Sequence, residues 1–287
     1  MSHDAQPDAP LDGVVDTARY PLSDPATLRE VVARVRRELD DTGCSVLPGF
    51  VRPERQDALR AEGAALAPHA HHDVETVNVY NTAPDDTLPA DHPARVPMER
   101  GNAFVARDRI PAGALIQRIY TSAGFRGFVA ACFGLPEVHE LADPLSGLVL
   151  NVVAPGRGHP WHFDTNEYTV SMLTQEAQEG GVFEYCPGIR SAGAENLDAV
   201  RDVLDGRGAP RRLELRPGDL QLFRGRYSLH RVSPVGGATA RHTAIFAYSE
   251  RPGVVGTVAR TRQLFGRVTP AHLAAHERAV RVDGLLI

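Results

Sequence analysis

Hydrophobic residues recur at helical spacing through the first half of the chain. An apolar stripe, with a capping residue at Ser23 or Asp24 and a stop at Gly43, predicts a first helix between them. Short strands are expected over 44–47 and 74–80. Three more helices are expected over 53–67, 112–121 and 124–133, and a long Pro- and Asp-rich loop over 82–97.

The pattern changes to alternating, β-branched and aromatic positions between about residues 138 and 250. Turns rich in glycine, proline and aspartate separate these runs, which is typical of an all-β sandwich or jelly roll. The expected strands are 148–153, 168–174, 182–185, 212–215, 220–223 and 243–248.

The segments around this β core complete the predicted domain. A helix-like segment lies within 187–211, and helices are expected again over 257–265 and 270–279. Residues 1–22 are rich in Asp, Ala and Pro, which predicts a loose N-terminal tail. We therefore expect one domain over 23–287, mainly β with flanking helices.

Composition narrows the classes of function. All 31 basic residues among the 287 are arginine, which excludes a lysine Schiff base and a P-loop lysine. The net charge of −5 comes from interspersed charges, so no nucleic-acid partner is expected. The N-terminus lacks an apolar signal region, and no apolar stretch approaches the roughly 20 residues of a membrane span. We expect a cytoplasmic protein with a small-molecule substrate and no membrane partner. A homodimer is left open.

The candidate chemistry lies in a His-x-Asp pair. His162 and Asp164 are separated by one residue, so on an extended strand their side chains share one face. His230, from a distant strand, completes a two-histidine, one-carboxylate set. Such a set is the ligand set of non-haem Fe(II) oxygenases and leaves positions open for a co-substrate and dioxygen.

An arginine on the next strand strengthens this interpretation. Arg241 opens the run that ends at Tyr248, and a guanidinium inside a β core needs an anionic partner. The free carboxylate of 2-oxoglutarate is such a partner. Together with the turn that begins at Pro217, these residues resemble the Fe(II)/2-oxoglutarate-dependent oxygenases. The resemblance implies a double-stranded β-helix (a cupin-like jelly roll) and Fe(II), 2-oxoglutarate and O2 as cofactor and co-substrates.

A narrower resemblance rests on four segments. They are Ala142-Asp143-Pro144, Trp161-His162-Phe163-Asp164, Gly180-Gly181-Val182-Phe183-Glu184-Tyr185 and Phe223-Arg224-Gly225-Arg226-Tyr227-Ser228-Leu229-His230. They are similar to the amino-acid radical halogenases related to the lysine chlorinase and to the hydroxylating relatives of these enzymes. Halogenating members have a small residue where Asp164 stands, so the resemblance implies a hydroxylase. Lysine-acting members have an acidic residue where this chain has Thr165, so it implies an amino-acid-like substrate without specifying lysine.

Other polar residues near the motif are candidates for ligand binding, each with a structural alternative. Asn151 either donates a hydrogen bond to 2-oxoglutarate or is a satisfied buried amide. His159 contacts a substrate carboxylate or lies on a surface turn, and Arg100 is a carboxylate clamp or an exposed loop residue. Asn166 or Glu167 faces the pocket, where an acidic group suits an amine, or begins a solvated strand.

Two other interpretations of the sequence concern a histidine-rich segment and the type of reaction. The histidines at 69, 71 and 72 have no second cluster at ligand spacing, so we expect a solvated loop there rather than a metal site. The alternatives to hydroxylation are desaturation or cyclisation by the same iron chemistry, and a non-catalytic jelly-roll binding protein.

Overall fold

The computed structural model describes residues 11–22, 24–166 and 168–275. Its α-helices are α1 (Pro25–Thr42), α2 (Gln56–Leu66), α3 (Leu115–Thr121), α4 (Ala123–Phe133), α5 (Leu197–Leu204), α6 (Val258–Phe265) and α7 (Pro270–Ala275). The strands before the metal motif are β1 (Cys44–Leu47), β2 (Glu75–Val77), β3 (Met98–Arg100), β4 (Ala103–Val105), β5 (His139–Glu140) and β6 (Leu148–Val153). The later ones are β7 (His159–His162), β8 (Thr169–Gln175), β9 (Glu179–Gly180), β10 (Phe183–Cys186), β11 (Arg211–Leu213), β12 (Leu220–Phe223), β13 (Leu229–Val232), β14 (Val235–Gly236) and β15 (Arg241–Ser249).

Two antiparallel sheets form the β core. The larger has the order β1-β12-β8-β15-β6-β4, with β5 added at the end of β15. The smaller has the order β11-β10-β13-β7. Neighbours in each sheet come from distant parts of the sequence, which is the Greek-key connectivity of a jelly roll. The predicted fold class is confirmed.

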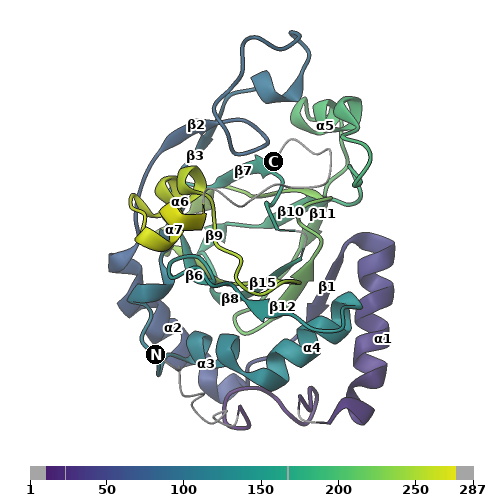
Figure 1. Cartoon of the computed structure of the whole chain (residues 1–287), viewed down its shortest axis with the longest axis vertical. Helices are drawn as coiled ribbons and strands as arrows, with labels where there is room; N and C mark the ends of the chain where they lie inside the picture. Colours follow the sequence, from purple (N-terminus) through teal and green to yellow (C-terminus); the bar gives the residue numbers. More distant parts are fainter. Residues whose placement is uncertain (1–10, 23, 167, 276–287) are drawn as a thin grey trace.

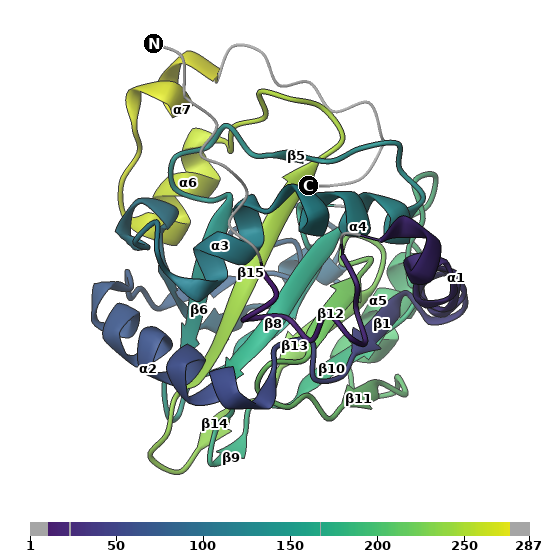
Figure 2. The same ribbon diagram turned by 90° about the horizontal axis from the view of Figure 1, so that it is seen from below.

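The helices cover one face of the larger sheet. Figure 2 shows α2, α3 and α4 on the near side of the larger sheet and α1 at its edge beside β1, and the largest hydrophobic cluster fills the space between the helices and the sheet. Opposite this helical layer, the smaller sheet and α5 enclose the other side of the β core, while α6 and α7 lie at its flank (Figure 1). No helix in the described ranges is long and apolar enough to cross a membrane.

Local signals placed the helix ends correctly. Asp24 caps α1 by accepting hydrogen bonds from the backbone N–H groups of Ala26 and Thr27, and Gly43 ends it in the left-handed conformation at φ 69°. The second predicted helix begins with a 3-10 turn, Pro53–Arg55, before α2. Residues 276–279 of the last predicted helix lie outside the described residues.

Two predictions are wrong, one about the N-terminal segment and one about the limits of the β core. Residues 11–22 do not form a loose tail, because Leu11, Val14, Val15 and Tyr20 are buried in the main hydrophobic cluster and Val15 bridges to Val51. The β core also extends beyond 138–250, since β1 and β4 pair with β12 and β6 at the edges of the larger sheet.

Candidate metal centre

The structure brings His162, Asp164 and His230 together inside the β core. His162 and His230 face each other as a cross-strand pair between β7 and β13, with ring centroids 4.1 Å apart. Asp164 Oδ1 lies 3.7 Å from His162 Nε2 and 3.5 Å from His230 Nε2. One ligand atom from each residue lies within 4.8 Å of the other two, and this is the single such group of metal-ligand side chains in the described part of the chain.

The outer nitrogen of each histidine is held by the backbone. His162 Nδ1 lies 2.8 Å from the Pro160 carbonyl oxygen, and His230 Nδ1 lies 2.9 Å from that of Ser228. A carbonyl can only accept, so Nδ1 donates in both rings and the Nε2 lone pairs point toward Asp164. Burial, together with the neighbouring His159 and His230, keeps the pKa of His162 well below its usual value. Its imidazole is therefore neutral, as a metal ligand must be.

Asp164 has the charge and the orientation of a ligand. Burial opposes its ionisation, but His230, His162 and the hydroxyl of Thr169 outweigh that effect and hold the pKa of the carboxyl below its usual value. Thr169 Oγ1 donates to Asp164 Oδ2 at 2.6 Å, which leaves Oδ1 toward the histidines. A Cβ at Gly225 would lie 1.9 Å from Oδ2, so only glycine leaves room for this carboxylate.

The residue between the two ligands of the motif is fixed from several sides. The Phe163 ring stacks on Tyr80, and the buried Arg190 guanidinium lies 3.9 Å from its centroid. Its backbone N–H donates to the Val79 carbonyl, and its carbonyl accepts from Asn81 Nδ2 at 3.2 Å. These contacts set the direction of the backbone from which both ligand side chains extend.

Arg241 is buried in the β core without an acidic partner within 4.0 Å in the described ranges, and its one side-chain hydrogen bond there is to the Thr243 hydroxyl. Burial lowers the pKa of Arg241 to about 10, so it keeps its charge at neutral pH. Asn151 on β6 pairs with Thr243 on β15. Because cross-strand partners share a face, Asn151 and Arg241 lie on the same side of the larger sheet. An unpaired interior guanidinium of this kind fits an anionic ligand.

His159 and Arg100 are buried rather than on surface turns or loops. The His159 ring stacks on His162 at a centroid distance of 3.6 Å, and its buried Nε2 has no hydrogen-bond partner within the described part of the chain. Asn102 Nδ2 lies 3.3 Å both from His159 Nδ1 and from Asn151 Oδ1. Arg100, 1% exposed, pairs with Glu75 at 2.6 Å, across the antiparallel pair of β2 and β3.

The remaining substrate candidates lie after the motif. Thr165 and Asn166 are exposed, and the Thr165 carbonyl accepts from Arg226 at 3.4 Å. Glu167 lies outside the described residues. Sequence reasoning missed Thr169, Asn81 and Arg190, because short polar or charged residues outside a motif carry no signal of which side chain they will meet.

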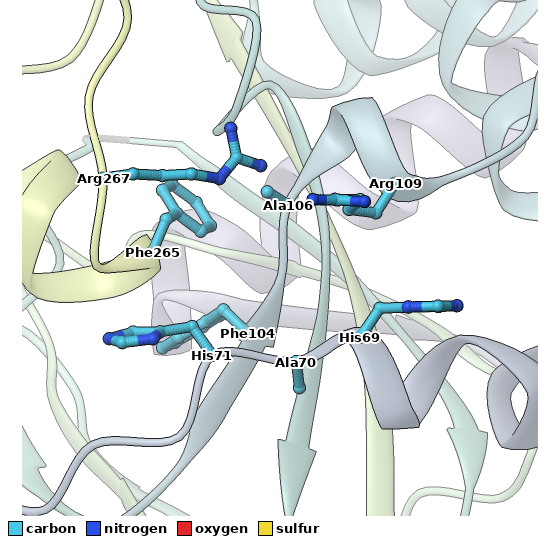
Figure 3. A pocket seen from close by; sticks show the side chains of 8 residues that line it. All are labelled: His69, Ala70, His71, Phe104, Ala106, Arg109, Phe265 and Arg267. Atoms are coloured by element: carbon cyan, nitrogen blue, oxygen red, sulfur yellow. The ribbon is translucent and has the colours of Figure 1, made fainter.

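The histidines at 69 and 71 line a different pocket. Figure 3 shows them with Arg109 and Arg267 around an open pocket of about 300 Å³, which Phe104 and Phe265 also line. Arg267 is paired with Asp108 at 2.6 Å. No residue of the triad lines this pocket, so it is separate from the candidate metal centre.

Comparison with known proteins places this geometry in context. No curated protein matches the chain. Epimerase SnoN in complex with Fe3+, alpha ketoglutarate and nogalamycin RO aligns at TM-score 0.53 and 14% identity, covering 78% of this chain and 84% of that one. AviO1 from Streptomyces viridochromogenes Tue57 aligns at 0.52 and 16%, covering 76% and 94%. A prolyl hydroxylase from Trichoplax adhaerens, solved with a peptide fragment, aligns at 0.52 and 13%, covering 80% and 95%.

At these identities the structural matches show a shared fold. The family described as HalD, Halogenase D, matches residues 27–260, which span all three members of the triad, Arg241 and most of the described chain. The chain therefore belongs to the Halogenase D family.

Proposed function

We propose that the protein is an Fe(II)- and 2-oxoglutarate-dependent dioxygenase that hydroxylates an unactivated C–H bond of a small polar substrate, an amino acid or a similar metabolite. One observation carries the proposal: a buried His162–Asp164–His230 triad lies in the same β core as Arg241, which has no acidic partner among the described residues. When bound, the iron with 2-oxoglutarate and dioxygen supplies an oxidant strong enough to take hydrogen from such a bond.

The residues present fit these groups. Two imidazoles whose Nδ1 atoms donate to backbone carbonyls and one ionised carboxylate form the ligand set that suits Fe(II), and their partners Pro160, Ser228 and Thr169 orient them in advance. Arg241 binds the distal carboxylate of 2-oxoglutarate with a planar pair of N–H donors. The Asn151 amide, on the same side of the sheet, is available for a second contact.

Asp164 favours hydroxylation over the halogenation for which the family is named. A carboxylate at this position occupies the coordination place that a halide takes in relatives with a small residue there. The observed carboxylate is directed at the histidines and held by Thr169, so it is not displaced to a surface position. The choice between hydroxylation, desaturation and cyclisation depends on where the substrate carbon lies.

The test is an anaerobic titration with Fe(II) and then 2-oxoglutarate, followed by the visible charge-transfer band. We expect one equivalent of iron and a band that appears with 2-oxoglutarate in the wild type. His162→Ala should lose both, whereas His72→Ala, which removes an exposed histidine, should lose neither. Identical titrations for wild type and His162→Ala would remove the metal site and with it the proposed function.

Succinate release should then be followed with a panel of amino acids, with mass spectrometry of the products. A mass gain of one oxygen supports hydroxylation, and a loss of two hydrogens supports desaturation or ring closure.

A further inference from the structure

The pocket of Figure 3 lies outside the metal centre and is lined by basic side chains. Its walls come from the histidine-rich segment 69–71, the 3-10 turn Arg107–Arg109 and the end of α6. Among the described residues, neither the triad nor Arg241 nor Asn151 contributes to its lining. Its volume of about 300 Å³ is at the lower end of the range for small-molecule sites. The pocket is therefore a candidate ligand site of its own, and it does not depend on the proposed function.

The lining of this pocket carries an excess of positive charge. Arg109 and Arg267 contribute to it, and no aspartate or glutamate of the described residues does. Figure 3 shows both guanidinium groups on one side of the pocket and the rings of His71 and Phe104 on the other. Asp108, which pairs with Arg267 at 2.6 Å, is the one carboxylate within 4.0 Å of either guanidinium in the described chain. Two positive charges and one negative charge leave a surplus of one, and a concave surface concentrates the field of such a surplus.

Most donors of these two arginines are available to a ligand. Arg267 Nη2 donates to Asp108 Oδ1 at 2.6 Å, and the other donors of this guanidinium have no acceptor among the described residues. The side chain of Arg109 makes no hydrogen bond or ion pair with any described residue. An arginine offers five N–H donors in a planar fork, and this fork matches a carboxylate with two parallel hydrogen bonds. Asp108 therefore holds Arg267 in place and leaves it able to bind an anion.

Contacts between distant segments fix the shape of the pocket. The backbones of His71 and Phe104 exchange two hydrogen bonds, at 2.9 and 3.3 Å. The His71 ring packs against Gly266, which ends α6 at φ 67° and where a Cβ would lie 2.6 Å from that ring. Phe104 and Phe265 belong to one hydrophobic cluster. The apolar part of the lining is thus in place before any ligand binds, which lowers the cost of binding.

We propose that this pocket is a second ligand site, apart from the metal centre, and that it binds a small organic carboxylate with an apolar body. The carboxylate lies between Arg109 and Arg267, and its single negative charge balances the surplus positive charge. The apolar body lies against Phe104 and Phe265. A ligand that has only the charge or only the apolar body makes one of these two sets of contacts and binds more weakly.

The experiment measures ligand binding to the full chain by calorimetry, under anaerobic conditions with Fe(II) and saturating 2-oxoglutarate. The excess of co-substrate keeps the probes from competing for Arg241. The probes are benzoate, benzamide, which has a similar shape without the charge, and acetate, which has the charge without the ring. In the wild type we expect benzoate to bind more tightly than either of the other two.

The variants alter one arginine at a time. Arg109→Gln should weaken benzoate binding roughly 10-fold, the lower end for a lost charge-assisted hydrogen bond because the pocket is open to solvent, and should leave benzamide binding unchanged. Arg109→Lys keeps the charge without the planar fork and should retain part of the affinity. Arg37→Gln is the matched control, because Arg37 is an exposed arginine of α1 that also has no ion pair among the described residues. It should bind benzoate as the wild type does.

His162→Ala separates this site from the metal centre. It should bind benzoate as tightly as the wild type, because no residue of the triad lines the pocket. Loss of benzoate binding in His162→Ala would place the carboxylate at the metal centre and overturn the proposal. Two other results would overturn it as well: wild-type protein that binds benzamide or acetate as tightly as benzoate, and equal benzoate affinity in Arg109→Gln and Arg37→Gln. Failure of the proposed function is distinguishable from all three, because it appears as a missing charge-transfer band in the wild type.

Discussion

Gly225 shows how closely single residues fit the metal site. Its backbone carbonyl accepts from the Asp164 N–H at 3.1 Å, so the two backbones are in direct contact. Any side chain at this position would occupy the space of the Asp164 carboxylate. The glycine is therefore required by a close approach, since its φ does not lie in the left-handed region.

Gly225→Ala should displace the Asp164 carboxylate and weaken metal binding roughly 10- to 100-fold, the usual cost of disturbing the surroundings of a ligand. Equilibrium dialysis with Fe(II) measures this affinity. Gly193→Ala is the control, because a Cβ there meets nothing within 4 Å. Equal iron affinity in both variants would mean that Asp164 is not a ligand.

Arg241→Ala should raise the KM for 2-oxoglutarate far more than it changes iron affinity. The lost pair is worth about 2 to 5 kcal/mol when both groups are buried. Steady-state succinate release at varied 2-oxoglutarate measures the effect. Arg231→Ala is the comparison, because Arg231 is paired with Glu184 at 2.7 Å. If the two variants respond alike, the co-substrate is held elsewhere.

Asp164→Gly should open the coordination position of the carboxylate to chloride and abolish most hydroxylation. We expect little chlorinated product, because the outcome also depends on where the substrate lies and on the unchanged surroundings such as Thr169. Product mass spectrometry with and without chloride is the measurement, beside the charge-transfer band. A charge-transfer band that does not change with chloride argues against Asp164 as an iron ligand. Efficient chlorination would show that the residues around the ligands have little influence on the product.

At the scale of elements, the pairing of β7 with β13 decides the site. It sets His162 opposite His230, although the two residues are 68 positions apart in the sequence. The loop after β7 then depends on contacts from elsewhere: Arg190 follows β10, and Tyr80 and Asn81 follow β2. The geometry of the motif is thus supported by β13 and by the two segments that follow β10 and β2.

The substitution Arg190→Met tests how much the buried Arg190 stabilises the structure around the motif. Arg190 is fully buried, stacks on Phe163 and pairs with Glu195 at 3.2 Å. Removing one partner of a buried ion pair typically costs about 3 to 5 kcal/mol, so the free energy of unfolding should fall by this order. Urea denaturation followed by Trp161 fluorescence measures it. Arg201→Met, in a more exposed pair with Asp205, should cost less than about 1 kcal/mol. Equal losses of unfolding free energy in the two variants would mean that Arg190 stabilises the fold no more than the more exposed Arg201 does.

At the scale of the whole molecule, buried neutral histidines make stability depend on pH. His242 is 3% exposed, and burial lowers its pKa to about 4, below the roughly 6.5 of an unfolded chain. Between these values the unfolded state binds more protons, so the free energy of unfolding falls as pH falls. Above pH 6.5 this contribution to stability is complete.

We expect the free energy of unfolding of His242→Gln to change less with pH than that of the wild type. The wild type should lose about 1.4 kcal/mol for each pH unit of the interval on account of this one residue, with further losses from the triad. Denaturation midpoints at pH 7, 5.5 and 4.5 measure the difference between the proteins. Parallel curves for wild type and His242→Gln would show that His242 is not the titrating group.

Local sequence patterns predicted many of the secondary-structure elements. Alternating positions predicted the strands 148–153 and 220–223, and Asp24 and Gly43 predicted the limits of the first helix, because periodicity and capping depend on near neighbours. The triad was expected from His-x-Asp and a downstream histidine, since alternation alone puts the first two side chains on one face.

Only the tertiary structure decided which distant groups meet. The burial of Leu11, Val14, Val15 and Tyr20, the hydrogen bond from Thr169 to Asp164 and the close approach of Gly225 all depend on contacts across the fold. No local pattern encodes such contacts, because each depends on how separate elements pack. The surroundings of the motif therefore form only when the segments next to β2, β3 and α6 pack against it and against one another.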